Sequence, residues 1–140
     1  MSSGTLSLTV ANRGPDEDGV FRLGIRASNG EFSAHSETWA VSDGVSELVA
    51  QLNGFPRRIP DEVIFKTGEP SDVTLKFSTL GKTGHCGIQV MVRAAPVAEA
   101  YRAEIAGSAN FWIQCSAEEV SSFRTQLARL FETRTATFGE

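Results

Sequence analysis

Two stretches of this chain repeat one pattern: an alternating strand that carries a tryptophan, a serine, and then an amphipathic helix. The first stretch spans residues 32–55 and the second spans residues 101–131. At an offset of 75 positions, the helix residues Val45, Leu48, Gln51, Leu52 and Phe55 fall on Val120, Phe123, Gln126, Leu127 and Leu130. Apolar residues with this spacing form one stripe along a helix, and that stripe must be buried. The repeat therefore predicts two helices that pack on a common sheet.

The helix ends carry their own signals. We expect the first helix to begin near Ser42 or Asp43, which can accept a hydrogen bond from a free backbone amide, and to end at Gly54. At the second helix, Ser116 and Glu119 fit a capping box. The polar residues of that helix are expected to face water; they are Arg124, Gln126 and Arg129.

The rest of the chain alternates between apolar and polar residues, which is the period of half-buried strands. Strands are expected at residues 6–10, 21–27, 31–41, 63–65, 73–77, 88–92, 101–105 and 111–115. The sequence Ser28-Asn29-Gly30 favours a hairpin between two of them. Widely separated helices with hairpin-linked strands between them are typical of α+β folds.

The predicted fold is α+β, with a mostly antiparallel sheet, two amphipathic helices on one face, and the order βββα-ββββ-α in two similar halves. Whether the sheet is continuous or splits into two layers is left open. A chain of 140 residues buries roughly two-thirds of its unfolded surface, so residues 1–140 are expected to form a single globular domain. Residues 132–140 are expected to be a frayed tail, with Phe138 as the one residue that could dock.

Composition narrows the partners and the location. The chain has a net charge of −4 and few lysines, and clustered cations are what bind phosphate backbones, so we expect no nucleic-acid partner. No apolar run approaches the roughly 20 residues that cross a bilayer, so no membrane partner is expected. Met1–Thr5 has neither the basic stretch nor the apolar core of a signal peptide, which favours a cytoplasmic location.

The residue types that carry most catalysis and metal binding are sparse. Cys86 and Cys115 are expected to be a reduced, buried pair, because Cys115 continues an apolar alternation. His35 and His85 lack a third ligand at a coherent spacing. We therefore expect no catalytic residue, no metal site and no cofactor.

Two charged segments are candidate partner-binding sites. Asp16, Glu17 and Asp18 form either a solvated acidic turn or a partner contact, since loops on a rigid scaffold often carry function. The second segment is the adjacent basic pair Arg57 and Arg58, which prolines flank in an expected loop.

Each tryptophan precedes a helix and has two possible roles. Trp39 and Trp112 could each seal a helix against the sheet with a large flat side chain. Alternatively, each could be an exposed anchor in an interface, where tryptophan is enriched.

The order of these features resembles the small bacterial immunity proteins of the WapI type and related uncharacterised bacterial families of similar length. The likeness runs from Phe32 to Leu130 and rests on Gly30-Glu31-Phe32-Ser33, Val45-x-x-Leu48-Val49-x-x-Leu52, Asp72-Val73-Thr74-Leu75-Lys76-Phe77, Gly84-His85-x-x-Ile88-x-Val90 and Phe123-x-x-x-Leu127-x-x-Leu130. Before the last helix this chain has Gln114-Cys115-Ser116, where those families tend to have an acidic residue and glutamine.

This resemblance implies a cytoplasmic, non-enzymatic protein that neutralises a cognate toxin domain by binding it. The acidic net charge would suit a partner with a basic active site, because complementary charge speeds association. The alternative is a small-ligand-binding or regulatory domain with a pocket between the sheet and the helices.

Overall fold

The protein has an α+β fold in which every strand pairing is antiparallel. The computed structural model describes residues 6–14, 18–67, 72–81, 85–93 and 108–139. The elements in chain order are β1 (Leu6–Asn12), β2 (Val20–Asn29), β3 (Ser33–Val41), α1 (Ser42–Gln51), β4 (Glu62–Thr67), β5 (Asp72–Leu80), β6 (His85–Arg93), β7 (Ser108–Cys115), α2 (Ala117–Leu127), α3 (Leu130–Thr133) and β8 (Thr135–Gly139). The predicted order βββα-ββββ-α is confirmed, and α3 and β8 follow it. The strand expected at residues 101–105 lies outside the described residues.

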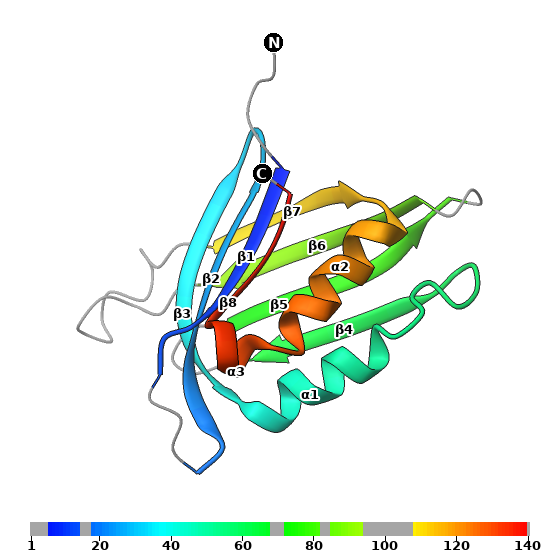
Figure 1. The fold of residues 1–140 in the computed structure, drawn as a ribbon. Helices are drawn as coiled ribbons and strands as arrows, with labels where there is room; N and C mark the ends of the chain where they lie inside the picture. The colour runs from blue at the N-terminus through cyan, green and yellow to red at the C-terminus, as the bar shows by residue number, and fades with distance from the viewer. Residues whose placement is uncertain (1–5, 15–17, 68–71, 82–84, 94–107, 140) are drawn as a thin grey trace.

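The strands form two separate four-stranded sheets, which answers the question that the sequence left open. Sheet A has the strand order β3-β2-β1-β8, and sheet B has the order β4-β5-β6-β7. The two sheets cross at a steep angle (Figure 1). Two side chains tie them together: Thr67 Oγ1 donates to the carbonyl of Trp39 at 2.7 Å, and Asn29 Nδ2 donates to the carbonyl of Trp112 at 3.3 Å.

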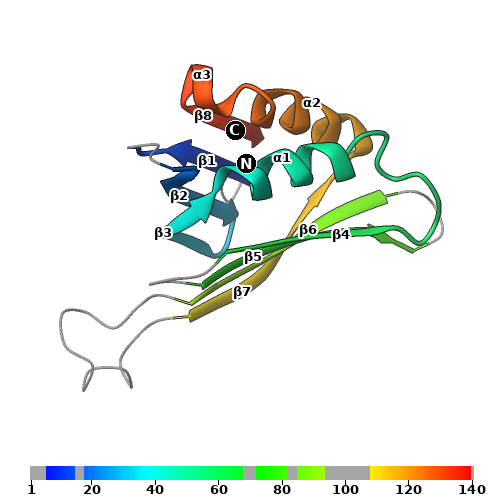
Figure 2. The same ribbon diagram turned by 90° about the horizontal axis from the view of Figure 1, so that it is seen from below.

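Both long helices cover the same face of sheet B and leave its other face uncovered by any described element (Figure 2). Phe123 of α2 packs against Phe77 of β5 with ring centroids 6.5 Å apart. Phe131 of α3 meets Phe21 of β2 edge to face at 5.0 Å. The buried residues of both sheets and the helices form one hydrophobic cluster.

The two halves share their helix pattern. α1 begins at Ser42 and α2 begins at Ala117, which is the same offset of 75 positions. The apolar helix positions are buried in both halves: Val45 with Val120, Leu48 with Phe123, Leu52 with Leu127, and Phe55 with Leu130. The predicted stripes are therefore the core-facing sides of both helices.

The helix ends agree with the sequence in two of three places. The capping box of α2 is present, because Glu119 N donates to Ser116 Oγ at 3.1 Å and Ser116 N donates to Glu119 Oε1 at 2.9 Å. Gly54 has the left-handed φ of 74° expected after α1. The predicted side-chain cap of α1 is wrong: Ser42 lies inside the helix, and its amide donates to the carbonyl of Gly19 at 2.7 Å.

The expected frayed tail at residues 132–140 is wrong for most of its length. Residues 135–139 form β8, which pairs with β1, and Ala136 is fully buried. Gln126 of α2 fixes the outer side of this strand: its Nε2 donates to the Thr137 carbonyl and its Oε1 accepts from the Thr137 amide, both at 2.8 Å. The side chain of Phe138 lies outside the described residues.

Gln126 and Arg124 were expected to face water, and that expectation is also wrong. Arg124 Nε donates to the carbonyl of Val49 at 2.8 Å and so joins α2 to the end of α1. Of the three, only Arg129 is exposed, and the other two are half-buried. Among the described residues, no helix has the length and apolar character that a bilayer crossing requires.

Candidate functional site: the outer face of sheet A

The outer face of sheet A gathers cations from separate strands. Residues on β2 and β3 alternate between the core side and the outer side of the sheet, although Gly24 on the outer side of β2 is also buried. We call this surface the arginine face; it consists of Thr9, Arg13, Arg22, Gly24, Arg26, His35, Glu37 and Trp39. No described element covers it (Figure 2).

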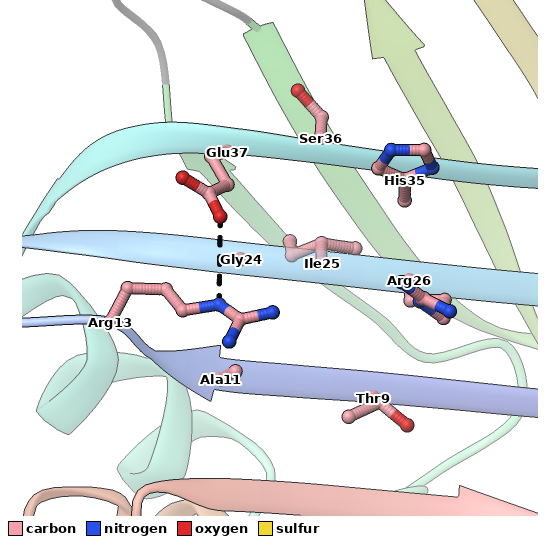
Figure 3. A pocket seen from close by; sticks show the side chains of 9 residues that line it. All are labelled: Thr9, Ala11, Arg13, Gly24, Ile25, Arg26, His35, Ser36 and Glu37. Atoms are coloured by element: carbon pink, nitrogen blue, oxygen red, sulfur yellow. Dashed lines mark ion pairs between the residues drawn. The ribbon is translucent and has the colours of Figure 1, made fainter.

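A hollow of about 120 Å³ lies in the middle of the arginine face. It exists because Gly24 has no side chain to fill the space above β2. Arg13, which follows β1, and Glu37 of β3 meet over Gly24 with Nε and Oε2 3.5 Å apart (Figure 3). A Cβ at position 24 would lie 3.2 Å from Arg13 Nε, so a larger residue here would require the Arg13 side chain to shift by a few tenths of an ångström.

The charges on the arginine face do not balance. Glu37 accepts a hydrogen bond from Arg22 and forms an ion pair with Arg13, and it is the only carboxylate among the described residues of that face. Arg26 lies between Thr9 and His35 across the strands and has no ion pair within the part of the chain that the structure describes (Figure 3). Three arginines against one glutamate leave an excess of two positive charges in a chain whose net charge is −4.

The two tryptophans lie on outer faces and do not seal the helices. Trp39 is 43% exposed and Trp112 is 41% exposed. Their strand neighbours, including Ala40 and Ile113, take the core-facing positions, and successive strand residues point to opposite sides. The packing role is therefore wrong. The structure shows both tryptophans exposed, and their role as interface anchors stays a prediction.

Arg57 and Arg58, the predicted basic pair, surround a buried carboxylate. Asp61 is 3% exposed and accepts from the backbone amides of Arg57 and Glu62, both at 2.9 Å. Its oxygens also lie 3.4 Å from Arg57 Nε and 3.8 Å from Arg58 Nη2. The hydrogen bond from the Arg57 amide lowers the pKa of Asp61 below its ordinary value, against the opposing effect of burial. The pair thus has a structural task in this segment.

The acidic turn is described only in part. Asp16 and Glu17 lie outside the described residues, and Asp18 is exposed at the start of β2. The start of β2 and the loop between α1 and β4 lie apart in the molecule (Figure 1). The structure therefore does not bring the described part of the acidic turn and the basic pair together.

The cysteines face each other inside the protein. Cys86 and Cys115 are directly opposite across β6 and β7, and both are reduced and buried, as predicted. Burial raises the pKa of both thiols, and that of Cys115 rises to about 12 with further contributions from Cys86 and Glu119. His35 and His85 lie exposed on different sheets. No group of three metal-binding side chains occurs among the residues described.

The fold and this face define a class of protein: an α+β protein of two crossed sheets, with a cationic, uncovered sheet face. Comparison with known proteins adds no family to that description. No protein-family model matches the chain, and neither the curated proteins nor the solved structures contain a match. The resemblance to immunity proteins therefore stays a prediction.

Part of the arginine face has a signal in the sequence. Arg22, Gly24 and Arg26 alternate along one predicted strand, so they had to share one side of it. Arg13 and Glu37 join them only through the pairing of three strands, which no local pattern reveals.

Proposed function

We propose that this chain is a non-enzymatic protein-binding module whose arginine face contacts its partner. The observation that carries the proposal is the gathering of three arginines and a half-exposed tryptophan on one uncovered sheet face. Arginine and tryptophan are the residues most enriched where protein interfaces hold their binding energy. Trp39 lies directly opposite Arg22, so the two belong to one surface.

The partner that fits the resemblance is a toxin domain, which the module would neutralise by occupying it. The net negative charge alone would favour a basic partner. The arginine face has the opposite sign, so the part of the toxin that docks there should be acidic.

A non-enzymatic role is supported by the state of the thiols. A cysteine acts as a nucleophile through its thiolate. Burial raises the pKa of Cys86 and Cys115, which keeps both protonated near neutral pH.

Co-expression with toxin domains encoded beside the gene tests this function. We expect one such toxin to become harmless to the host cell and to co-elute with this protein in size-exclusion chromatography. Arg26→Ala and Trp39→Ala should weaken that complex, whereas Arg129→Ala, which removes an exposed arginine elsewhere, should not. Absence of protection and of any complex would refute the function. Equal binding by all three variants would refute the choice of surface.

The small-ligand alternative predicts a different result. Ligand sites usually enclose roughly 300–1,000 Å³. The hollow on the arginine face measures about 120 Å³ and falls below that range, whereas an open depression of about 460 Å³ beside Gln51, Arg57 and Glu62 falls within it. A thermal-shift screen against metabolites separates the two functions, since a ligand at 100 times its dissociation constant adds roughly 2.7 kcal/mol of stability.

A further inference from the structure

We propose that the hollow above Gly24 is a carboxylate-binding site that takes an aspartate or glutamate side chain of the protein partner. This inference rests on the proposed function, because it names the chemistry that the arginine face would recognise. It concerns a defined place on that face, which Gly24, Arg26 and His35 help to line.

The first argument is that Arg26 has no ion pair among the described residues. Arg13 and Arg22 both lie against Glu37, so that carboxylate is already engaged. Arg26 lines the same hollow as Glu37 but forms no ion pair in the described part of the chain, because Glu37 pairs with Arg13 and Arg22 instead. An arginine guanidinium can hold a carboxylate through two parallel hydrogen bonds, so Arg26 is the cation of the hollow that can receive a partner's carboxylate.

The second argument is size. The hollow of about 120 Å³ accommodates a group of a few atoms and not a whole metabolite. A carboxylate at the end of a side chain meets this limit, because its stem can leave through the open side of the hollow. Thr9 and His35 flank Arg26 across the strands and add polar groups at the rim (Figure 3).

The third argument is the amount of charge. An excess of two positive charges suits one or two carboxylates of an acidic segment. A nucleic acid would bring many phosphates toward a chain with a net charge of −4, and its affinity depends on neutralising several of them at once. We therefore assign the site to an acidic protein segment.

The test is a titration of the full-length, ¹⁵N-labelled protein with a hexaglutamate peptide at low salt, followed by amide chemical shifts. We expect saturable shifts at Gly24, Arg26 and His35. Arg26→Ala should raise the dissociation constant of the peptide by about tenfold or more, which corresponds to the loss of a charge-assisted hydrogen-bonded pair. Gly24→Val should raise it similarly by filling the hollow. Arg129→Ala, the matched control, should stay within about twofold.

Several outcomes would overturn the inference. They are the absence of shifts around Gly24, equal weakening by Arg129→Ala, or tighter binding of inorganic phosphate than of the peptide in a parallel titration. Because Arg26 has no described ion pair, its substitution keeps the test valid if Gly24→Val fails to fold. Toxin neutralisation without peptide binding would refute this inference alone, and peptide binding without any neutralised toxin would refute the proposed function alone.

Discussion

Replacing Asp61 by alanine tests how the segment between α1 and β4 is held. This carboxylate receives two backbone amides, from Arg57 and Glu62, at 2.9 Å each. A hydrogen-bond donor left without its partner in a buried place costs about 1–3 kcal/mol. Arg57 and Arg58 are 46% and 71% exposed at their side chains, so water replaces much of what they lose.

We therefore expect Asp61→Ala to lower the free energy of unfolding by about 2–4 kcal/mol, since two amides are orphaned and water reaches them only partly. For a chain of this length, that loss lowers Tm by roughly 7–14 °C. Urea unfolding followed by circular dichroism measures the first quantity, and a thermal melt measures the second. The control is Glu62→Ala, which removes an exposed carboxylate whose ion pair with Lys76 spans 3.1 Å and contributes at most about 1 kcal/mol.

The stability difference between wild type and Asp61→Ala should also depend on pH, in a direction that the pKa of Asp61 determines. The pKa of Asp61 is lowered on folding, so its stabilisation is complete above its ordinary pKa and is lost as pH falls through the folded value. The stability gap between wild type and Asp61→Ala should therefore narrow from about pH 5 toward pH 2. A loss no larger than that of Glu62→Ala, or a gap that does not change with pH, would refute the reasoning.

Three further predictions follow from the helix cap, the thiols and the last strand. Ser116→Ala should destabilise the protein by about 1 kcal/mol in urea, because it removes the capping box, whereas the exposed Ser122→Ala should change stability by less than about 0.5 kcal/mol. Cys86 and Cys115 should resist a thiol-specific disulfide reagent at pH 8 in the folded protein and react once urea unfolds it, since burial raises both pKa values; rapid labelling of the native protein would contradict this. Deleting residues 135–140 should remove the cooperative thermal transition, because β1 then loses a paired strand, and an unchanged melt would show that β8 is dispensable.

The helices could be predicted because their signal is local. An apolar stripe at helical spacing has only one way to be buried, and Leu48 and Phe123 follow it in both halves. The capping box of Ser116 and Glu119 is equally local, since both partners lie within one turn. The first helix has no such box, and the amide of Ser42 instead finds the carbonyl of Gly19. That contact depends on the pairing of β2 with β3, which places Gly19 beside Ser42, and no local sequence pattern predicts it.

The last strand was missed because its partner is remote. Residues 135–139 form a short segment, Thr-Ala-Thr-Phe-Gly, in which only Ala136 has a described side chain that is fully buried. Their pairing with β1 joins the two ends of the chain, so the favourable contacts appear only when the sheet is assembled. Thr137 and Thr9 illustrate this, because their hydroxyl oxygens lie 3.3 Å apart although 128 positions separate them in the sequence.

The outward direction of the tryptophans follows from strand alternation, although their large flat side chains had suggested a place under the helices. The alternation that places Ile113 in the core also directs Trp112 outward. On the outer face, the indole of Trp112 packs over Gly87. A Cβ added at position 87 would lie only 3.1 Å from Trp112 Cε3. A large aromatic ring on a strand can thus find cover on the outer face of its own sheet.

The contact between Gln126 and β8 has a consequence for self-association. An edge strand offers unpaired amides and carbonyls that can recruit a strand from another copy, which is a route to aggregation. On β8, the amide group of Gln126 binds both the N–H and the carbonyl of Thr137, as a neighbouring strand would. Sheet A therefore ends against a helix side chain, and growth of a fibre from this side would first require α2 to detach.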